Sequence, residues 1–288
     1  MKIASRRVLI MVLLIIGVSL ILFPVVSNLY NYVTATKVID TYQKEVKATS
    51  KAKKKQLKEE MSQYNKELAA GTETVTDPFK STDQGKAPVA KVSVYDNLAE
   101  ELGEVLGEVT IPKIEVKLPI YNGTSELQLK KGAGLLKGTS LPVGGEGTHS
   151  VISAHRGLPT AKLFTDLPKL AIGDVFFIET LEETLAYRVD QIKVVKPENV
   201  EDIRVNSQAD YFTLLTCTPY MVNTDRLLVR GERIPYTAEV KKSLKKASQR
   251  QRWLPIIKSL LLIISVIGLV ICYYLWQRRR SSQKAKSK

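Results

Sequence analysis

The sequence predicts a mainly β domain that is carried by two membrane-spanning helices. Two apolar runs without charge, residues 8–26 and 259–276, each approach the roughly 20 residues that a helix needs to cross a bilayer. Between about 107 and 236, short segments that alternate apolar and polar residues are separated by Pro and Gly turns. This pattern is typical of a small closed barrel or a sandwich.

The first predicted element is a membrane anchor over residues 1–34. A short basic leader with Lys2, Arg6 and Arg7 precedes the apolar run, which favours a cytoplasmic N-terminus. The alternative is a cleaved signal sequence. The run is long for such a signal, and the small residues that follow, Thr34-Ala35-Thr36, form a poor cleavage site. We therefore expect an uncleaved anchor.

Residues 35–104 are predicted to form a helical extension that includes a loop. From 35 to 70 the chain is rich in Lys, Glu, Gln, Ala and Leu. One helix or a pair of helices is expected here, packed on another part of the protein through a thin apolar stripe of Val38, Tyr42, Val46, Leu57, Met61, Tyr64 and Leu68. Residues 71–92 have the composition of a loop, which contains the motif Asp77-Pro78-Phe79. A short helix is expected over 95–102.

The β domain is predicted over residues 105–236. Its expected strands cover 107–112, 114–121, 149–154, 174–179, 184–195, 211–217 and 227–236. Asn122-Gly123 indicates a turn, and the clearest short helix between the strands is 163–167.

After the β domain come a basic juxtamembrane segment over 237–252, a transmembrane helix over 253–277 and a basic cytoplasmic tail over 278–288. The Arg278-Arg279-Arg280 tail and the basic leader place both termini inside and the domain outside, although the basic cluster from Lys241 to Arg252 argues the other way.

The net charge of +14 does not indicate a nucleic-acid-binding protein, because the basic excess flanks the apolar runs and residues 8–236 are nearly neutral. Lys and Arg in such positions contact anionic lipid headgroups, so membrane lipids are the expected partners of these flanks.

Cys217 is the candidate nucleophile of the β domain. The other cysteine, Cys272, lies in the second apolar run, and an unpaired cysteine outside the cell is a candidate reactive thiol or an inert buried residue. Cys217 ends one predicted strand and Arg226 opens the next. In an antiparallel hairpin the two would be neighbours, where a guanidinium can stabilise a thiolate or an oxyanion.

A histidine would complete an activated-nucleophile site, and the chain has two. His149 and His155 stand six residues apart on one predicted strand, so only one can reach a given thiol. His155 is followed by a turn, like Cys217, whereas His149 is expected to begin the strand at the far rim. His155 is therefore the candidate, against the alternative that a lone histidine is structural.

Three separated motifs resemble the sortases, in the order His, Cys, Arg of that family. They are the opening strand 107–114, Ser153-Ala154-His155-Arg156-Gly157-Leu158-Pro159, and Thr216-Cys217-Thr218-Pro219-Tyr220 with Arg226-Leu227-Leu228-Val229-Arg230 after it. The helical extension, the second span and Asp77-Pro78-Phe79 are similar to class C, the pilin-polymerising sortases of Gram-positive bacteria. Phe79 stands where many members carry Trp. The alternative for this motif is an ordinary Asp-Pro turn.

The resemblance implies a sortase-type eight-stranded β-barrel with a lid loop of Asp77, Pro78 and Phe79 over the cleft. It also implies a cysteine transpeptidase that cleaves an LPxTG-like sorting signal of a pilin subunit and transfers the acyl group to a lysine amine of another. Cys217 would be the nucleophile, Arg226 the oxyanion donor and His155 the acid and base. No cofactor or metal is expected, because two histidines without a dense carboxylate cluster suit neither zinc nor calcium.

Three alternatives stay open at this point. A membrane-anchored cysteine peptidase, or thiol protease, would use the same three residues and release the acyl group to water. A housekeeping-type sortase would attach proteins to the cell wall. A membrane-tethered scaffold would leave Cys217 unreactive.

Overall fold

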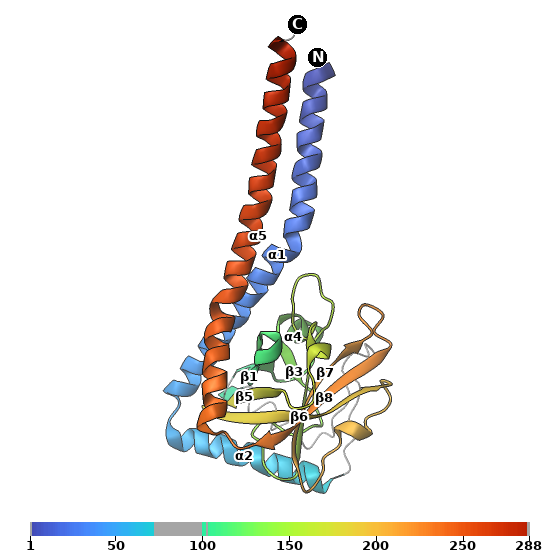
Figure 1. Cartoon of the computed structure of the whole chain (residues 1–288). Coiled ribbons are helices and arrows are strands. Elements are labelled where there is room, and N and C mark those ends of the chain that lie inside the picture. The colour runs from blue at the N-terminus through green and yellow to red at the C-terminus, as the bar shows by residue number, and fades with distance from the viewer. Residues whose placement is uncertain (1, 72–99, 102, 287–288) are drawn as a thin grey trace.

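The computed structural model describes residues 2–71, 100–101 and 103–286 (Figure 1). Eight strands close into a barrel in the order β1-β2-β3-β4-β7-β8-β6-β5. Their bounds are β1 Val105–Ile111, β2 Val116–Tyr121, β3 Ala133–Leu135, β4 Thr148–Ser153, β5 Val175–Thr180, β6 Glu183–Val195, β7 Asp210–Thr218 and β8 Asp225–Ile234. The pairs β2–β3 and β4–β7 are parallel, and the other pairs are antiparallel. The predicted mainly β class and eight-stranded barrel are confirmed.

Two details of the sequence interpretation are wrong. The predicted helix over 163–167 is a series of turns followed by the 3-10 helix η2 (Leu167–Lys169), because Leu163 has a φ of 39°, outside the helical region. The strand predicted from 114 begins at Val116, because the 3-10 helix η1 (Pro112–Ile114) precedes it. The short strand β3 was not predicted, since three residues are too few to show an alternating pattern.

Two helices at the N-terminal side of the barrel form the predicted extension. α1 (Lys2–Ala48) runs without interruption from the apolar run into the domain, and α2 (Lys51–Ala70) follows with Ser50 as its N-cap. α1 contains Pro24, which removes a helical hydrogen bond, and Figure 1 shows that the helix is bent. The predicted packing stripe is confirmed, because Tyr42, Val46, Leu57, Met61, Tyr64 and Leu68 are buried.

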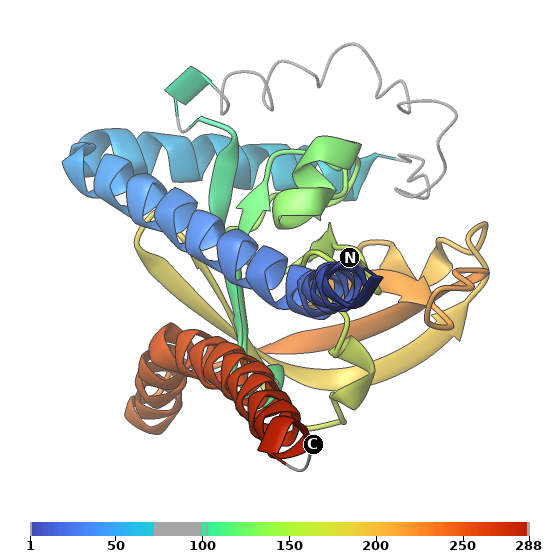
Figure 2. The same ribbon diagram turned by 90° about the horizontal axis from the view of Figure 1, so that it is seen from above.

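Polar contacts fix both helices on the barrel. The Tyr42 hydroxyl donates to the Leu106 carbonyl at 3.0 Å and accepts from the Leu181 N–H at 3.1 Å. The Asn65 side chain pairs with the backbone of Leu141 as a neighbouring strand would, donating to its carbonyl at 3.0 Å and accepting from its N–H at 2.7 Å. Figure 2 shows α2 beside α1, with α5 over another side of the barrel.

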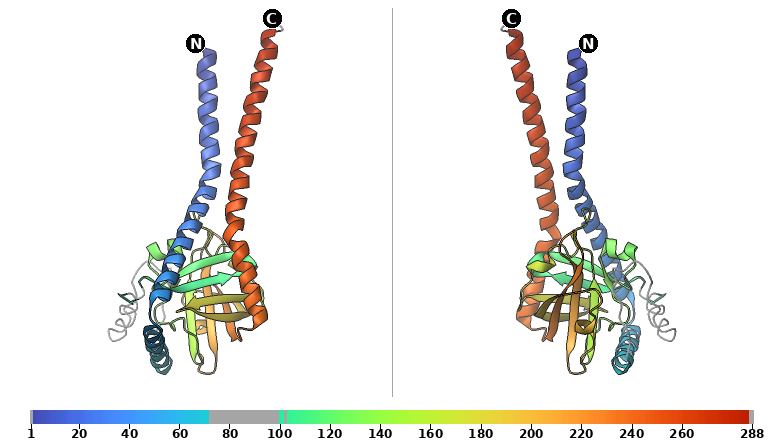
Figure 3. Two further views of the ribbon diagram at one scale, coloured as in Figure 1. Left: turned by 90° about the vertical axis from the view of Figure 1, so that its left-hand side faces the viewer. Right: turned by 90° about the vertical axis from the view of Figure 1, so that its right-hand side faces the viewer.

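α5 (Ala238–Lys286) is one helix that covers the basic juxtamembrane segment and the second apolar run. α1 and α5 contact each other and leave the barrel on the same side, and both termini lie at their far end (Figure 3). The stretches Val12–Ala48 and Ile256–Trp276 are long and apolar enough to cross a membrane. The short helices α4 (Glu126–Lys131) and η3 (Glu201–Ile203) complete the described elements.

Candidate active site

The β7–β8 hairpin brings Cys217 and Arg226 together. The two residues are direct partners in the antiparallel register, as the sequence predicted. Each is 7% exposed. Arg226 Nη1 donates to the carbonyl oxygens of Asn223 at 3.1 Å and Asp225 at 3.0 Å, so the turn fixes the direction of the guanidinium. A thiol and a fixed cation therefore share one end of the hairpin.

The parallel pairing of β4 with β7 brings His155 to the same end. Ser153 is aligned with Leu215, and the Ala154 N–H donates to the Leu215 carbonyl at 3.2 Å. The Thr216 hydroxyl donates to the Ala154 carbonyl at 2.7 Å, which continues the pairing by one residue. His155 and Cys217 are the next residues of the two segments, so the register brings them to neighbouring positions at this end of the barrel.

His155 is half-buried and lies near a carboxylate that the sequence analysis did not identify. Its Nε2 atom is 3.5 Å from Glu126 Oε2, an ion-pair distance that is long for a hydrogen bond. Burial lowers the pKa of His155 from its ordinary value of 6.5, the Glu126 carboxylate opposes this shift, and the positive charge of Lys130 adds to it. Neutral imidazole is therefore favoured, which is the form that can accept a proton from a thiol.

Glu126 begins α4, which has a capping box between Ser125 and Gln128. The spacing Ser-x-x-Gln is visible in the sequence and could have predicted this helix. Its proximity to His155 depends on the packing of α4 against the barrel, and no local pattern reports that contact.

The loop after His155 contacts the loop after Cys217. Arg156 Nη1 donates to the Thr218 hydroxyl at 2.9 Å, and the guanidinium lies 5.7 Å from the centre of the Tyr220 ring. The Phe164 N–H donates to the His155 carbonyl at 3.1 Å. These contacts hold the backbone on both sides of the candidate site.

His149 lies at the other end of β4, as predicted. It is the second residue of that strand and is aligned with Tyr211 of β7. Its ring is 1% exposed, with Nδ1 2.8 Å from the Arg204 carbonyl and Nε2 2.8 Å from the Thr213 hydroxyl. Both ring nitrogens therefore have partners far from Cys217, and this histidine is structural.

A small cleft beside Arg226 is lined mainly by apolar side chains. They come from β6, β7, β8 and the segments after β3 and β6, and are Leu136, Val195, Pro197, Val200, Ile203, Leu215 and Leu228. Its free volume is about 10 Å³, the space of about one water molecule, so a peptide side chain can enter only after the lining residues move apart.

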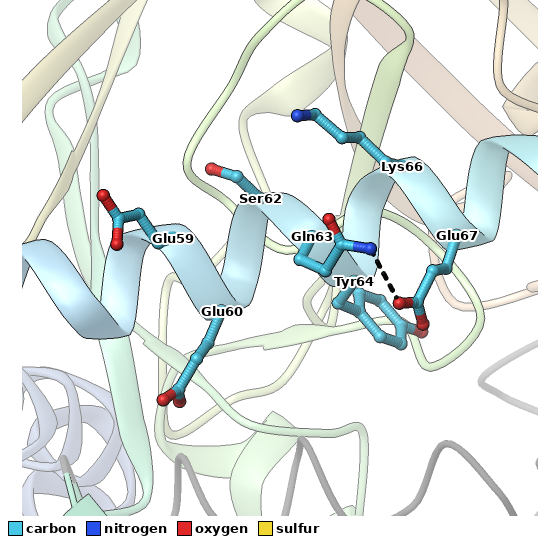
Figure 4. A pocket seen from close by; sticks show the side chains of 7 residues that line it. All are labelled: Glu59, Glu60, Ser62, Gln63, Tyr64, Lys66 and Glu67. Atoms are coloured by element: carbon cyan, nitrogen blue, oxygen red, sulfur yellow. Dashed lines mark hydrogen bonds between the residues drawn. The ribbon is translucent and has the colours of Figure 1, made fainter.

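A second, more open hollow of about 570 Å³ lies over α2 and does not include the candidate site (Figure 4). Its described lining comes from one helix and is Glu59, Glu60, Ser62, Gln63, Tyr64, Lys66 and Glu67, with a hydrogen bond of 2.9 Å from Gln63 to Glu67. This described lining has neither a cysteine nor a histidine, so the candidate chemistry is assigned to the end of the barrel that holds Cys217, His155 and Arg226. The predicted lid residues Asp77, Pro78 and Phe79 lie outside the described residues.

Comparison with known proteins identifies the family to which this fold belongs. Residues 109–234 match the model of the sortase domain family. The solved sortase C1 of pilus island 1 of group B Streptococcus is 44% identical, and the alignment covers 71% of this chain and 94% of that chain with a TM-score of 0.63. A solved sortase C of Streptococcus pneumoniae is 46% identical, with coverages of 70% and 98% and a TM-score of 0.62. Sortase A of Streptococcus agalactiae is 31% identical over 131 residues, which is 44% of this chain and 52% of that relative.

Proposed function

Because this chain belongs to the class C sortases, a family of cysteine transpeptidases, we propose that it joins pilin subunits through isopeptide bonds. The observation that supports this function best is the convergence of Cys217, Arg226 and His155 at one end of the barrel, beside an apolar cleft. The substrate is an LPxTG-like sorting signal, and the acceptor is a lysine amine of another pilin.

The first step is acyl transfer to the enzyme. The Cys217 thiolate attacks the carbonyl carbon of the Thr–Gly bond, and the proton of the thiol passes to His155. Arg226 stabilises the oxyanion that develops on the carbonyl oxygen. His155 then donates the proton to the departing amine, so that the Thr–Gly bond breaks and a thioester on Cys217 remains.

The second step releases the product. The lysine amine of the next pilin attacks the thioester while His155 accepts its proton. The carbon–sulfur bond breaks, an isopeptide bond forms, and Cys217 regains its proton. We assign the Leu and Pro residues of the sorting signal to the apolar residues beside Arg226. These residues must move apart to admit them, because the cleft has a free volume of only about 10 Å³.

The same proposal includes the location of the enzyme. α1 and α5 each cross the cell membrane, both termini lie in the cytoplasm, and the barrel faces outward. This topology is supported by the basic residues that flank the apolar runs and by the exit of both helices from one side of the barrel.

Incubation of the soluble fragment 30–240 with candidate pilins tests the reaction. We expect covalent ladders on a denaturing gel and an isopeptide linkage in the mass spectrum. Cys217→Ala should form none while keeping its circular dichroism spectrum, because a small change at a strand end leaves little cavity. Release of free carboxylate without ladders would instead identify a peptidase, and ladders with Cys217→Ala would exclude Cys217 as the nucleophile.

A further inference from the structure

The turn that joins β7 to β8 exposes three consecutive apolar side chains next to the candidate active site. Tyr220 is 49% exposed, Met221 69% and Val222 64%, and we refer to these three residues as the β7–β8 tip. The N–H groups of Val222 and Asn223 both donate to the Pro219 carbonyl, at 3.2 and 3.0 Å. The tip is therefore an ordered turn. About half or more of each of its three side chains stays exposed in the described structure, which is unusual for consecutive apolar residues.

Contacts of α1 show how close this end of the barrel lies to the first apolar run. Asn28, two residues beyond that run, donates to the Pro159 carbonyl at 3.4 Å, and Asn31 donates to the Thr160 carbonyl at 2.8 Å. At about 1.5 Å of rise per helical residue, Asn28 lies about 3 Å and Asn31 about 8 Å beyond the end of the apolar run, measured along the helix axis. The headgroup layer of one leaflet is about 5–8 Å thick. With α1 crossing the bilayer over 8–26, as proposed above, the loop after His155 would lie at the depth of the headgroups.

The contacts of α5 independently place the same end of the barrel close to the second apolar run. Lys258 stands immediately before the apolar run 259–276, and its Nζ atom is 3.1 Å from Glu115 Oε2. Lys162, in the segment after His155, donates to the Ile114 carbonyl at 2.6 Å. Two helices thus place adjacent parts of the barrel at one depth.

The β7–β8 tip belongs to this same end of the molecule. β4 and β7 are parallel, so the segments that follow them, with His155 and the tip, emerge in one direction. A Cβ atom at Gly157 would lie 3.2 Å from the Tyr220 ring, and Arg156 contacts both Thr218 and Tyr220. Figure 1 shows the β7–β8 turn on the side of the barrel from which the long helices extend.

We propose that the β7–β8 tip rests in the headgroup region of the bilayer and holds the mouth of the active site against the lipid surface. Apolar side chains beside a Tyr and an Arg have the composition of interfacial anchors, since the apolar parts enter the boundary of the acyl chains and the polar ends stay at the headgroups. A lipid surface is favoured over a protein partner because the tip adjoins segments that the membrane helices themselves hold at headgroup depth. This inference rests on the proposed membrane-spanning role of α1 and α5.

The test uses the full chain with Cys217→Ala and Cys272→Ser, reconstituted in vesicles of phosphatidylcholine and phosphatidylglycerol. Single cysteines are introduced at Met221 or Val222 and labelled with an environment-sensitive fluorophore. The quencher is a lipid spin-labelled near the headgroup end of its acyl chain. Both labels are expected to shift their emission to the blue and to lose fluorescence when the spin-labelled lipid is present.

Two further labels are the controls. Leu13 is exposed on α1 within the apolar run, so a fluorophore attached to Leu13→Cys should be quenched by the spin-labelled lipid. Glu146→Cys is exposed in the turn before β4, at the opposite end of the barrel, and should keep its fluorescence. If the fluorophore at position 13 is quenched but those at positions 221 and 222 keep their fluorescence like the one at position 146, the tip does not contact lipid and the inference is wrong.

The other outcomes are equally decisive. If the label at Leu13 is not quenched, α1 does not span the bilayer, and both the proposed topology and the contact of the tip with lipid are rejected. If the tip labels respond only after a peptide with a sorting signal is added, the tip binds substrate and not the membrane.

Discussion

Acidification is expected to destabilise the folded protein through His149, and replacing this residue should remove that part of the pH dependence. The imidazole is almost fully buried between β4 and β7. Burial is the main cause that lowers its pKa from 6.5 to about 4. The hydrogen bond to the Arg204 carbonyl opposes this shift, the charge of Arg230 adds to it, and Asp190 opposes it.

The magnitude follows from the difference between the two states. As the pH falls below about 6.5, the unfolded chain binds a proton at this histidine, whereas the folded protein binds one only near pH 4. The stability that His149 contributes is thus present above pH 6.5 and is lost as the pH falls through about 4. With about 1.4 kcal/mol per pKa unit, the loss is about 3 kcal/mol.

Urea unfolding of the fragment 30–240 at about pH 7 and about pH 4 measures this loss. In His149→Gln, the decrease in the free energy of unfolding between these two pH values should be smaller than in the wild type by about 2–3 kcal/mol. His155→Gln is the matched control, and because its ring is only half-buried it should change the pH dependence less. An unchanged pH dependence in His149→Gln would show that other groups cause the acid sensitivity.

Three further substitutions test the site and its support. Arg226→Lys should lower turnover in the pilin assay by about 10²–10³-fold, because Lys retains the charge but loses the planar fork that the turn fixes. Glu126→Gln should move the His155 limb of the pH–rate profile to lower pH, by less than about one unit because this carboxylate is mostly exposed. Asn65→Ala should lower the free energy of unfolding by roughly 1–3 kcal/mol in urea titrations, because the buried N–H of Leu141 loses its acceptor, whereas the Leu141 carbonyl still accepts from Ser150 and Val143.

Two of these substitutions have a control variant in the same helix. Lys130→Gln removes a charge that lowers the pKa of His155, so it should move the limb in the opposite direction to Glu126→Gln. A shift of the same sign in both variants would contradict the electrostatic account. Gln63→Ala changes an exposed amide of α2 and should cost little stability, so an equal cost to Asn65→Ala would refute the role of the Asn65 pairing. Near-normal turnover of Arg226→Lys would mean that Arg226 acts only as a diffuse charge.

The sequence by itself predicted the features whose signals are local. Apolar runs predicted the two long helices, alternation predicted seven of the eight strands, and the short connection from Cys217 to Arg226 predicted their pairing in a hairpin. The motifs around His155 and Cys217 predicted the family. These signals depend on residues a few positions apart, which is the range over which backbone periodicity and turn chemistry act.

Only the tertiary structure decided which distant segments meet. The parallel pairing of β4 with β7 places His155 beside Cys217, and the packing of α4 places Glu126 beside His155. Parallel neighbouring strands are separated by long connections, so their register is fixed by core packing and by hydrogen bonds across the sheet. Neither of these produces a periodic pattern that can be read in the amino-acid sequence. For the same reason, the depth of the active-site end relative to the apolar runs followed only from the contacts of Asn31 and Lys258 with loops far away in sequence.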